Sequence, residues 1–342
     1  MLLSHATIVR NEAATLPDFL RRFDALYDEF VIVDTGSTDG TLDIKHPKLR
    51  LIRSDRFTAN TPRREFDFAA ARNEALDQVR GDWVGSFDPD DRLPAKTVRM
   101  LRKLFEGPKV ADFDLVMCHH SSGSEYLPKP HFWRTRLNLR YEDALDEVIN
   151  PPPHTKTLRL TNVAFEHTRS LGGMTPDAAR ARAEFYASIA ERQLELHPNS
   201  TSQQWKLARQ YANLKRYDEA IPLFQSAIAQ ADDTMSNSAL AWLMIYLAQC
   251  YCGVNDAEAA IKQLLAALDT YEWIAYARYL VGQIYEQLGQ LDEAEKWYRE
   301  ALATPPPPDL IWIDAPEFKD KAPEEALERL ARKRQEVPCG TN

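Results

Sequence analysis

The sequence has few cysteines, no long hydrophobic run and no excess of basic residues. Its four cysteines (Cys118, Cys250, Cys252 and Cys339) lack paired CxxC spacing, which argues against a disulfide framework or a zinc site and is typical of reduced cytoplasmic thiols. No apolar run approaches the roughly 20 residues that cross a bilayer. The first residues, MLLSHATIVRNE, lack the basic segment of a secretion signal. We therefore expect a cytoplasmic globular protein with no membrane span.

The net charge of −9 is concentrated in one half of the chain. Residues 1–174 contain 25 Lys+Arg and 26 Asp+Glu, whereas residues 175–342 contain 17 and 25. A nucleic-acid backbone is held by clustered positive charge. The charge balance therefore argues against a nucleic-acid partner, although the acidic half is suited to a basic one.

Short strand-like runs alternate with helical ones up to about residue 170. We expect strands at ATIV (6–9), FVIVD (30–34), LRLIR (49–53), WVGSFD (83–88) and FDLVMCHH (113–120), with helices at 16–26 and 68–80. This alternation predicts an α/β domain with a mostly parallel sheet, in which ligands bind at the carboxyl ends of the strands.

After Gly173 the pattern is entirely helical and contains an internal repeat. Three copies align with periods of 40 and 34 residues, at Leu207-Ala208-x-x-Tyr211, Leu247-Ala248-x-x-Tyr251 and Val281-Gly282-x-x-Tyr285. The repeated pattern places small residues where two helices touch, and it resembles the tetratricopeptide repeat. The alternative interpretation of these helices is a generic helical bundle. The segment 323–336 is predicted to be a final helix that caps the stack.

Two polar segments follow expected strands and are candidates for a ligand site. In DTGSTDGT (34–41), Gly36 permits a tight turn, and Asp34 is suited to accept hydrogen bonds from a nucleoside. In SFDPDD (86–91), Asp88 and Asp90 stand at i and i+2, so both carboxylates can converge on one hard cation. Arg72, on the preceding helix, would counter a phosphate. The alternative for each segment is a polar turn without a ligand.

The segments ATIVRNEAATLPDFL, FVIVDTGSTDGT, ARNEAL and GDWVGSFDPDD, in this order and spacing, resemble family 2 glycosyltransferases of the GT-A fold. They are most similar to the subgroup in which tetratricopeptide repeats follow the transferase domain. The resemblance implies an α/β GT-A nucleotide-sugar-binding domain, with a Rossmann-like mixed sheet, at residues 1–172. An all-α repeat domain would follow at residues 175–338.

The resemblance also implies the residues of the donor site. The nucleotide-sugar-binding residues would be Arg10, Asn11, Glu12, Asp34, Gly36, Arg72 and Asp88. The metal ligands would be Asp88 and Asp90, as the family's Asp-x-Asp, together with His167, and the metal would be manganese or magnesium. A half-exposed histidine at a strand end is the alternative for His167.

The catalytic residues implied by the resemblance are Glu147, Asp146 and Asp91. Such enzymes often carry a His-Glu pair where this chain has Asp146-Glu147, so the histidine is replaced. Glu147 matches the family glutamate and suits a general base that deprotonates the acceptor. Asp146 is the second candidate, and Asp91 would lie close to the sugar or the acceptor. An exposed acidic run is the alternative for the pair.

The segment KPHFWRTRLNLRY (129–141) is locally basic and aromatic. Its rings and cations could form an acceptor surface, because sugars and bases stack on aromatic faces. Its alternation also fits a half-buried strand with charged residues outward.

These patterns together predict a metal-dependent glycosyltransferase. It would move a sugar from a nucleotide sugar, expected to be UDP-linked, to an acceptor with inversion at the anomeric carbon. The acceptor would be a protein or peptide, or a saccharide, whereas a modified nucleic-acid base fits the charge balance less well. A protein partner could also bind the repeat groove. The alternative is a catalytically impaired scaffold protein that acts through this groove.

Overall fold

The structure is a computed structural model that describes residues 1–121, 125–167, 175–233, 235–307, 313–314 and 321–336. The chain divides into two compact units. The first comprises residues 1–122, 128–179 and 188–193, and the second comprises 123–127, 180–187 and 194–342.

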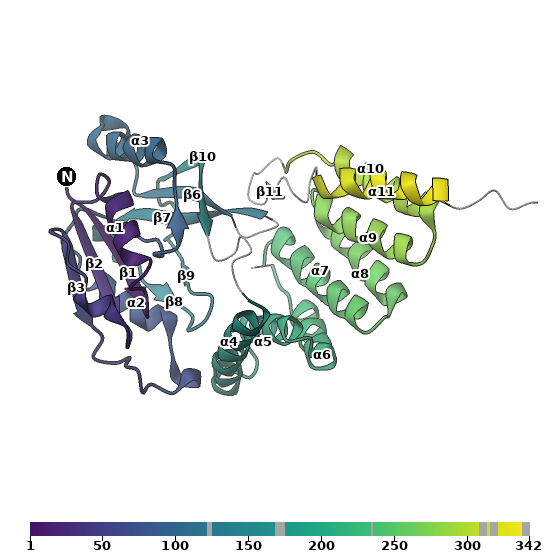
Figure 1. Cartoon of the computed structure of the whole chain (residues 1–342), viewed down its shortest axis with the longest axis horizontal. Helices are drawn as coiled ribbons and strands as arrows, with labels where there is room; N and C mark the ends of the chain where they lie inside the picture. The colour runs from purple at the N-terminus through teal and green to yellow at the C-terminus, as the bar shows by residue number, and fades with distance from the viewer. Residues whose placement is uncertain (122–124, 168–174, 234, 308–312, 315–320, 337–342) are drawn as a thin grey trace, which may run out of the picture. The chain divides into compact units, whose positions relative to one another are not determined.

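A mixed β-sheet forms the centre of the first unit (Figure 1). Its strands are β1 (Leu3–Val9), β2 (Glu29–Asp34), β3 (Leu49–Arg53), β4 (Trp83–Gly85), β5 (Asp91–Arg92), β6 (Leu115–Ser121), β7 (Glu125–Arg134) and β10 (Thr157–His167). They lie in the order β3-β2-β1-β4-β7-β6-β10-β5. The pairs β1–β2, β2–β3, β1–β4 and β6–β10 are parallel, whereas β4–β7 and β10–β5 are antiparallel.

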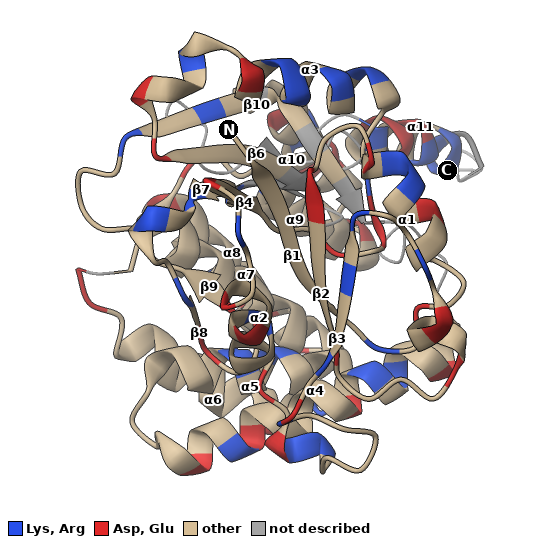
Figure 2. Cartoon of the chain, turned by 90° about the vertical axis from the view of Figure 1, so that its left-hand side faces the viewer, with Lys and Arg blue, Asp and Glu red and all other residues tan. Residues whose placement is uncertain are grey.

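Helices cover both faces of the sheet because successive strand residues point to opposite sides. Phe30 and Ile32 of β2 pack in one core with α1 (Leu16–Phe23) and α3 (Ala95–Glu106). Val33 packs in the other core with α2 (Phe68–Leu76). The outer face of α3 is basic, and its Lys and Arg residues are blue in Figure 2.

The parallel strands place the two predicted polar segments at one edge of the sheet. Val9 at the end of β1 is in register with Asp34 at the end of β2, and β4 runs parallel to β1. The loops that follow these strands therefore leave from the same edge. A short 3-10 helix, η1 (Gly40–Asp43), begins within the first segment, with Asp39 as its N-cap.

The segment 129–141 is not one strand. β7 ends at Arg134, and a 3-10 turn, η4 (Thr135–Leu137), follows with Asn138 in the left-handed conformation at φ 47°. A separate two-stranded hairpin then forms from β8 (Tyr141–Glu142) and β9 (Val148–Ile149). Two further 3-10 turns are η2 (Arg63–Glu65) and η3 (Pro108–Asp112).

The second unit is almost entirely helical, so the predicted order of an α/β part followed by an all-α part is confirmed. Its helices are α5 (Thr201–Asn213), α6 (Tyr217–Ala229), α7 (Asn237–Gly253), α8 (Ala257–Thr270), α9 (Ala275–Gln287), α10 (Leu291–Ala303) and α11 (Ala322–Glu336), and the longer α4 (Pro176–Leu196) precedes them. A two-residue strand, β11 (Ile313–Asp314), pairs with Glu125 and Tyr126, which also belong to the second unit.

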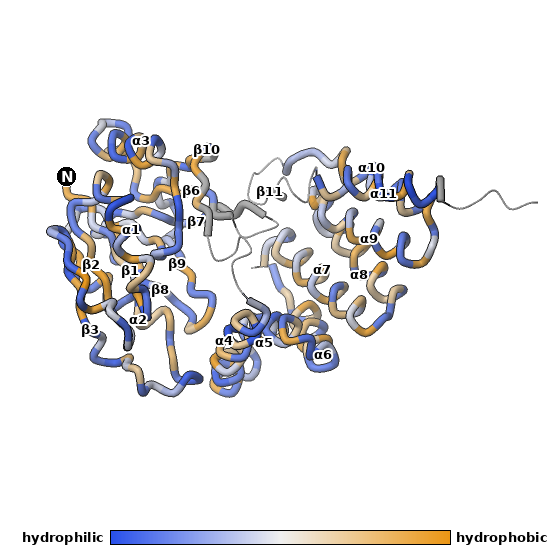
Figure 3. The backbone as a smooth tube through the Cα atoms, viewed as in Figure 1, coloured by the Kyte–Doolittle hydropathy of each residue, from blue (hydrophilic) through white to orange (hydrophobic). Residues whose placement is uncertain are grey.

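The helices form three antiparallel hairpins at the positions where the sequence repeats. The small residues Ala208, Ala248 and Gly282 occupy equivalent sites, and a methyl group on Gly282 would lie 2.6 Å from the Tyr298 ring. Because this distance is shorter than a van der Waals contact, glycine is the residue that fits here without a shift of Tyr298. Short hydrophobic stretches recur along these helices (Figure 3), as expected for a stack in which each hairpin buries the next.

The helix α11 caps the last hairpin, as predicted. Ala326 and Leu330 pack against Ala294 and Tyr298 of α10. In the described part of the chain, no helix is both long and apolar enough to cross a membrane.

Candidate active site

The loop after β2 is built around the carboxylate of Asp34. Asp34 is 2% exposed, and its Oδ1 accepts hydrogen bonds from the backbone N–H groups of Gly36 and Ser37, each at 3.0 Å. Gly36 has a φ of 104°, and an added Cβ would lie 2.3 Å from the backbone of Thr58 and Ala59. Only glycine fits this turn.

The loop after β1 is tied to the same turn. Asn11 adopts a left-handed conformation with a φ of 57°, and its side-chain oxygen accepts a hydrogen bond from Thr38 N at 2.8 Å. Its own N–H donates to Ser37 Oγ at 2.8 Å. Glu12 is buried, and Thr15 donates a hydrogen bond to its carboxylate. Among Arg10, Asn11 and Glu12, only the first two therefore expose their side chains.

The loop after β4 holds its three aspartates in different ways. Phe87 anchors the loop in the core, with its ring stacked on Phe165 at 4.3 Å. Asp91 is 4% exposed, and its Oδ2 accepts a hydrogen bond from Asp88 N at 2.8 Å. Asp88 and Asp90 are partly exposed. Two carboxylates are thus presented at the sheet edge, and the third closes the turn behind them.

Arg72 joins two of the predicted acidic residues. Its Nη2 donates to Asp88 Oδ1 and Oδ2 at 2.9 and 3.1 Å, and its Nε donates to Glu147 Oε1 at 2.5 Å. Burial by itself would lower the pKa of Arg72, but the carboxylates of Asp88 and Glu147 raise that pKa well above its ordinary value. The guanidinium therefore stays charged and bridges the loop after β4 to the β8–β9 hairpin.

The β8–β9 hairpin is docked on α2 through Tyr141. Asn73 accepts from Tyr141 N at 2.9 Å and donates to Tyr141 O at 3.0 Å. The Tyr141 hydroxyl donates to Ser86 Oγ at 2.8 Å, and burial raises the pKa of Tyr141 to about 12. The phenol therefore stays protonated, and these contacts fix the segment that carries Glu147. Asp146, beside it, has a left-handed φ of 53°.

The segment 129–141 does not present an aromatic acceptor surface. Phe132 and Trp133 are buried in the two cores. Arg136 pairs with Asp114, and Arg140 pairs with Asp77. The rings of Phe132 and Trp133 therefore support the sheet. The Arg72 guanidinium carbon lies over the Tyr141 ring, 5.5 Å from the centroid of that ring.

Thr7 and Ser86 also belong to this site, although the segments that contain them were not predicted to use these two residues. The buried Thr7 hydroxyl accepts from Arg72 Nη1 and donates to Asp88 Oδ1, both at 3.2 Å. The only sequence signal for Thr7 is a hydroxyl residue inside the apolar run ATIV.

The residues at this edge fit a divalent cation only in part. Asp88 and Asp90 supply hard carboxylate oxygens, which magnesium and manganese prefer. The backbone of His167 is in register with Asp91, but its side chain lies outside the described part of the structure. Within the described ranges, no group of three or more His, Cys, Asp or Glu residues is arranged to hold a metal. The set suits a cation that also receives phosphate oxygens from a ligand.

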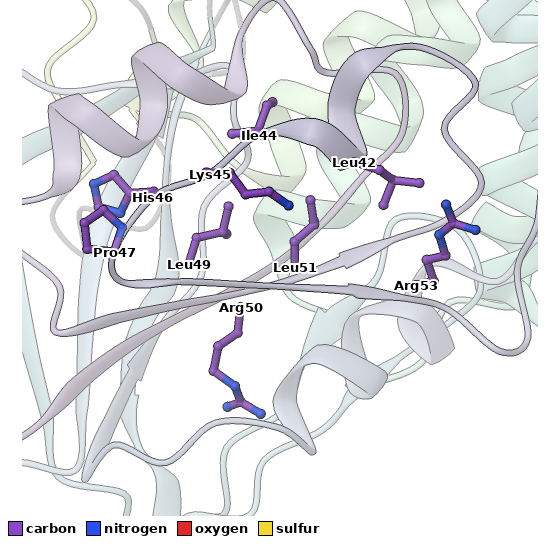
Figure 4. A pocket seen from close by; sticks show the side chains of 9 residues that line it. All are labelled: Leu42, Ile44, Lys45, His46, Pro47, Leu49, Arg50, Leu51 and Arg53. Atoms are coloured by element: carbon purple, nitrogen blue, oxygen red, sulfur yellow. The ribbon is translucent and has the colours of Figure 1, made fainter.

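A separate hollow of about 780 Å³ lies along the edge strand β3. Figure 4 shows Leu42, Leu49 and Leu51 on one side of the strand, with Arg50 on the other. None of the predicted site residues lines it. The hollow is therefore distinct from the cluster around Arg72.

Comparisons with known proteins identify both parts of the chain. Residues 4–162 match the model of Glycosyl transferase family 2, and residues 201–272 and 275–307 match models of the tetratricopeptide repeat. The TPR repeat-containing protein Synpcc7942_0270 of Synechococcus elongatus is 29% identical over 150 residues, which are 43% of this chain and 35% of that protein. The chain thus spans about a third of the length of this relative.

Solved structures that resemble parts of the chain include the following two. TarS 1–349 of S. aureus covers 80% of this chain and 91% of its own, with 15% identity and a TM-score of 0.41. MamA covers 47% of this chain and 98% of its own, with 20% identity and a TM-score of 0.33.

Proposed function

Residues 4–162 form a glycosyl transferase family 2 domain followed by tetratricopeptide repeats, and from this premise we propose that the protein is a metal-dependent transferase of sugars from a nucleotide-sugar donor. The observation that carries the proposal is the cluster in which Arg72 bridges Asp88 and Glu147. We assign residues 1–172 to the transferase domain and 175–338 to the repeats, in a cytoplasmic protein.

The nucleoside of the donor would bind at the loop of Asp34. Its Oδ2 is buried and accepts no hydrogen bond from the described residues, while its Oδ1 is fully used by the turn. A buried acceptor without a partner is costly, and a base N–H or a ribose hydroxyl would satisfy it. Arg10 and Asn11 flank this turn, and Gly36 keeps its backbone close. We propose UDP as the first nucleotide to test.

The diphosphate would bind between Arg72 and the carboxylates of Asp88 and Asp90. A manganese or magnesium ion held there, with His167 as a further candidate ligand, would neutralise the leaving diphosphate. The Arg72 guanidinium offers parallel donors for phosphate oxygens. Asp91 would hold the turn that presents these groups, since its carboxylate accepts from the Asp88 backbone.

The acceptor would be deprotonated by Glu147. Arg72 holds Oε1 of this carboxylate, so Oε2 is the oxygen that would take the proton. Direct displacement by the activated acceptor would invert the anomeric carbon. Asp146 is the second candidate for the base, because it adjoins Glu147 on the same loop. A protein or a saccharide is the proposed acceptor, and the repeats would bind a protein partner.

The first test of this function is the loss of the metal ligand. We expect Asp90→Ala, or chelation of the wild type by EDTA, to lower turnover of a nucleotide sugar at least about a hundredfold, because a cation supplies several kcal/mol of charge stabilisation. Release of the nucleoside diphosphate measures turnover across UDP, GDP and ADP sugars. Asp82→Ala, on the exposed turn before β4, is the control. Full transfer under both treatments would refute the metal role.

A scaffold protein with a silent transferase domain is the second candidate. The replaced histidine at Asp146 and the Arg72 contact that already occupies Asp88 favour it. Calorimetry with UDP and manganese separates the two candidates, because a scaffold would show no metal-dependent binding.

A further inference from the structure

All three nitrogen positions of the Arg72 guanidinium donate to groups of the protein. Nε donates to Glu147, Nη1 to Thr7 and Nη2 to both oxygens of Asp88. The side chain is only 12% exposed. In this arrangement Arg72 is an internal counter-ion of two carboxylates. It becomes a ligand for phosphate only when some of these hydrogen bonds are exchanged.

Thr7 fixes this arrangement from the sheet. It is fully buried on β1, and its hydroxyl accepts from Arg72 Nη1 while donating to Asp88 Oδ1. One hydroxyl can fill both roles at once. Thr7 therefore holds the guanidinium and the carboxylate in contact without taking charge itself.

A divalent cation and Arg72 would compete for the same carboxylate. Both oxygens of Asp88 already accept from Arg72, and two cations on one carboxylate repel each other. Within the described residues, Asp88 and Asp90 do not belong to a group of three or more His, Cys, Asp or Glu residues that is arranged to hold a metal. A cation binding to the protein alone would therefore displace Arg72 and gain few ligands.

We infer that Arg72, positioned by Thr7, occupies the place of the cation on Asp88 until the donor arrives. The cation then enters together with the diphosphate, and the guanidinium moves from Asp88 to the phosphate oxygens. This inference rests on the proposed function, since it assumes a cation at Asp88 and Asp90. It makes Thr7 a positioning residue and makes cation binding dependent on the nucleotide.

Manganese binding to the full chain tests this inference without any turnover. The free ion is measured by its EPR signal, with MnCl₂ alone and with MnCl₂ plus UDP. In the wild type we expect weak binding of manganese alone and at least about tenfold tighter binding with UDP. In Arg72→Met we expect at least about tenfold tighter binding of manganese alone, because the competing charge is gone. In Thr7→Val, which keeps the side-chain shape, we expect a gain of about threefold.

Two further variants separate competition from loss of structure. Arg50→Met removes an arginine whose contacts, Gln78 and Glu29, are not site residues, and it should bind manganese like the wild type. Arg72→Lys keeps the positive charge, so manganese alone should still bind weakly. If Arg72→Met does not fold, the comparison of Thr7→Val with the wild type decides the result.

The outcomes distinguish this inference from the proposed function. Equal binding of manganese alone by the wild type, Arg72→Met and Thr7→Val would overturn the inference while leaving a metal-dependent transferase intact. A change in Arg72→Met alone would overturn the role of Thr7. No manganese binding by the wild type with UDP, GDP or ADP would instead refute the proposed metal site, and the inference with it.

Discussion

Two charged clusters, one in each unit of the chain, are opposite in composition. In the first, the cation Arg72 is shared by the carboxylates of Asp88 and Glu147. In the second, the carboxylate of Glu286 accepts hydrogen bonds from Arg329, Lys333 and the Tyr298 hydroxyl. The first cluster thus has one cation for two carboxylates, whereas the second has two cations for one carboxylate and ties α11 to α9.

The clusters also differ in how the chain assembles them. The residues that contact Arg72 come from β1, from the loop after β4 and from a hairpin 75 positions further along the chain. Those around Glu286 come from a helix hairpin and its cap, with separations of 12 to 47 positions. In the first unit, contacts between distant parts of the chain bring reactive groups together. In the second unit, packing between neighbouring helix hairpins builds a stable support.

Glu147 gives the largest expected effect. Replacing it by Gln removes the proposed base but keeps the side-chain shape, so we expect turnover to fall by about 10² to 10⁴. The KM for the donor should change little. The measurement is steady-state kinetics with the best donor from the nucleotide-sugar screen. Glu142→Gln, on the exposed side of the same hairpin, serves as the control. Turnover within twofold of the wild type would exclude Glu147 as the base.

Substituting one tightly packed glycine in each unit compares how the two units respond to the same change. Gly36→Ala places a methyl group 2.3 Å from the backbone of Thr58 at a positive φ, whereas Gly282→Ala meets the Tyr298 ring at 2.6 Å. We expect each substitution to destabilise its own unit, by about 3 kcal/mol for Gly36 and 1–3 kcal/mol for Gly282. Only Gly36→Ala should also weaken UDP binding. Urea unfolding and UDP titration measure both effects, and weaker UDP binding in Gly282→Ala would contradict this division.

His5 should make the first unit sensitive to mild acid. Burial lowers the pKa of His5 to about 3, although its Nε2 lies 3.2 Å from the Phe87 carbonyl oxygen. The unfolded chain takes up a proton near pH 6.5 and the folded one does not. Stability is therefore lost as the pH falls below 6.5, by up to about 3 kcal/mol at pH 4.

Hydrogen exchange of peptides from β1 at pH 7, 5.5 and 4 follows this loss. His5→Gln cannot take up the proton, so its profile should be flatter than that of the wild type. Parallel profiles for the two proteins would show that another group causes the acid sensitivity.

Glu286 should make the second unit sensitive only to stronger acid. Hydrogen bonds from Arg329 and Lys333 lower the pKa of Glu286 to about 2, against burial, which raises it. Because the folded pKa is depressed, the stabilisation is present above the unfolded value near 4.3. It is lost as the pH falls from there towards 2.

We expect Glu286→Gln to cost about 2 kcal/mol at pH 7, a cost that shrinks below pH 4. Hydrogen exchange of α9 and α11 measures it, with the exposed Glu258→Gln as control. If Glu286→Gln were as destabilising at pH 3 as at pH 7, the substitution would act by removing packing contacts and not by removing the charge.

Much of the fold was predictable because its signals are local. The strands around Ile32 and Leu51 and the repeat sites of Ala248 and Gly282 follow from periodicity and residue size. The alternation in 129–141 fitted a half-buried strand, but the antiparallel direction of β7, its end at Arg134 and the β8–β9 hairpin were not predicted. Their boundaries depend on the left-handed Asn138 and on packing against α2, which no short pattern carries.

The candidate site was predictable in its parts but not in its connections. Asp34 ends an expected strand, Arg72 lies on an expected helix and Asp88 follows β4, and the structure brings Arg72 and Asp88 into contact. The roles of the individual residues stay predictions. Thr7 was missed because a threonine in a strand is ordinary, and only its contacts give it meaning.

Hydrophobic period and turn chemistry act within a few residues, so the amino-acid pattern alone predicts the two kinds of architecture and the edge of the sheet where polar groups collect. The contacts of Arg72 with Asp88 and Glu147, the inward turn of Asp91 and the burial of Glu12 follow only from the packed fold. Charges far apart in the chain pair according to the packing of the strands and helices that carry them. Their partners follow from the fold as a whole.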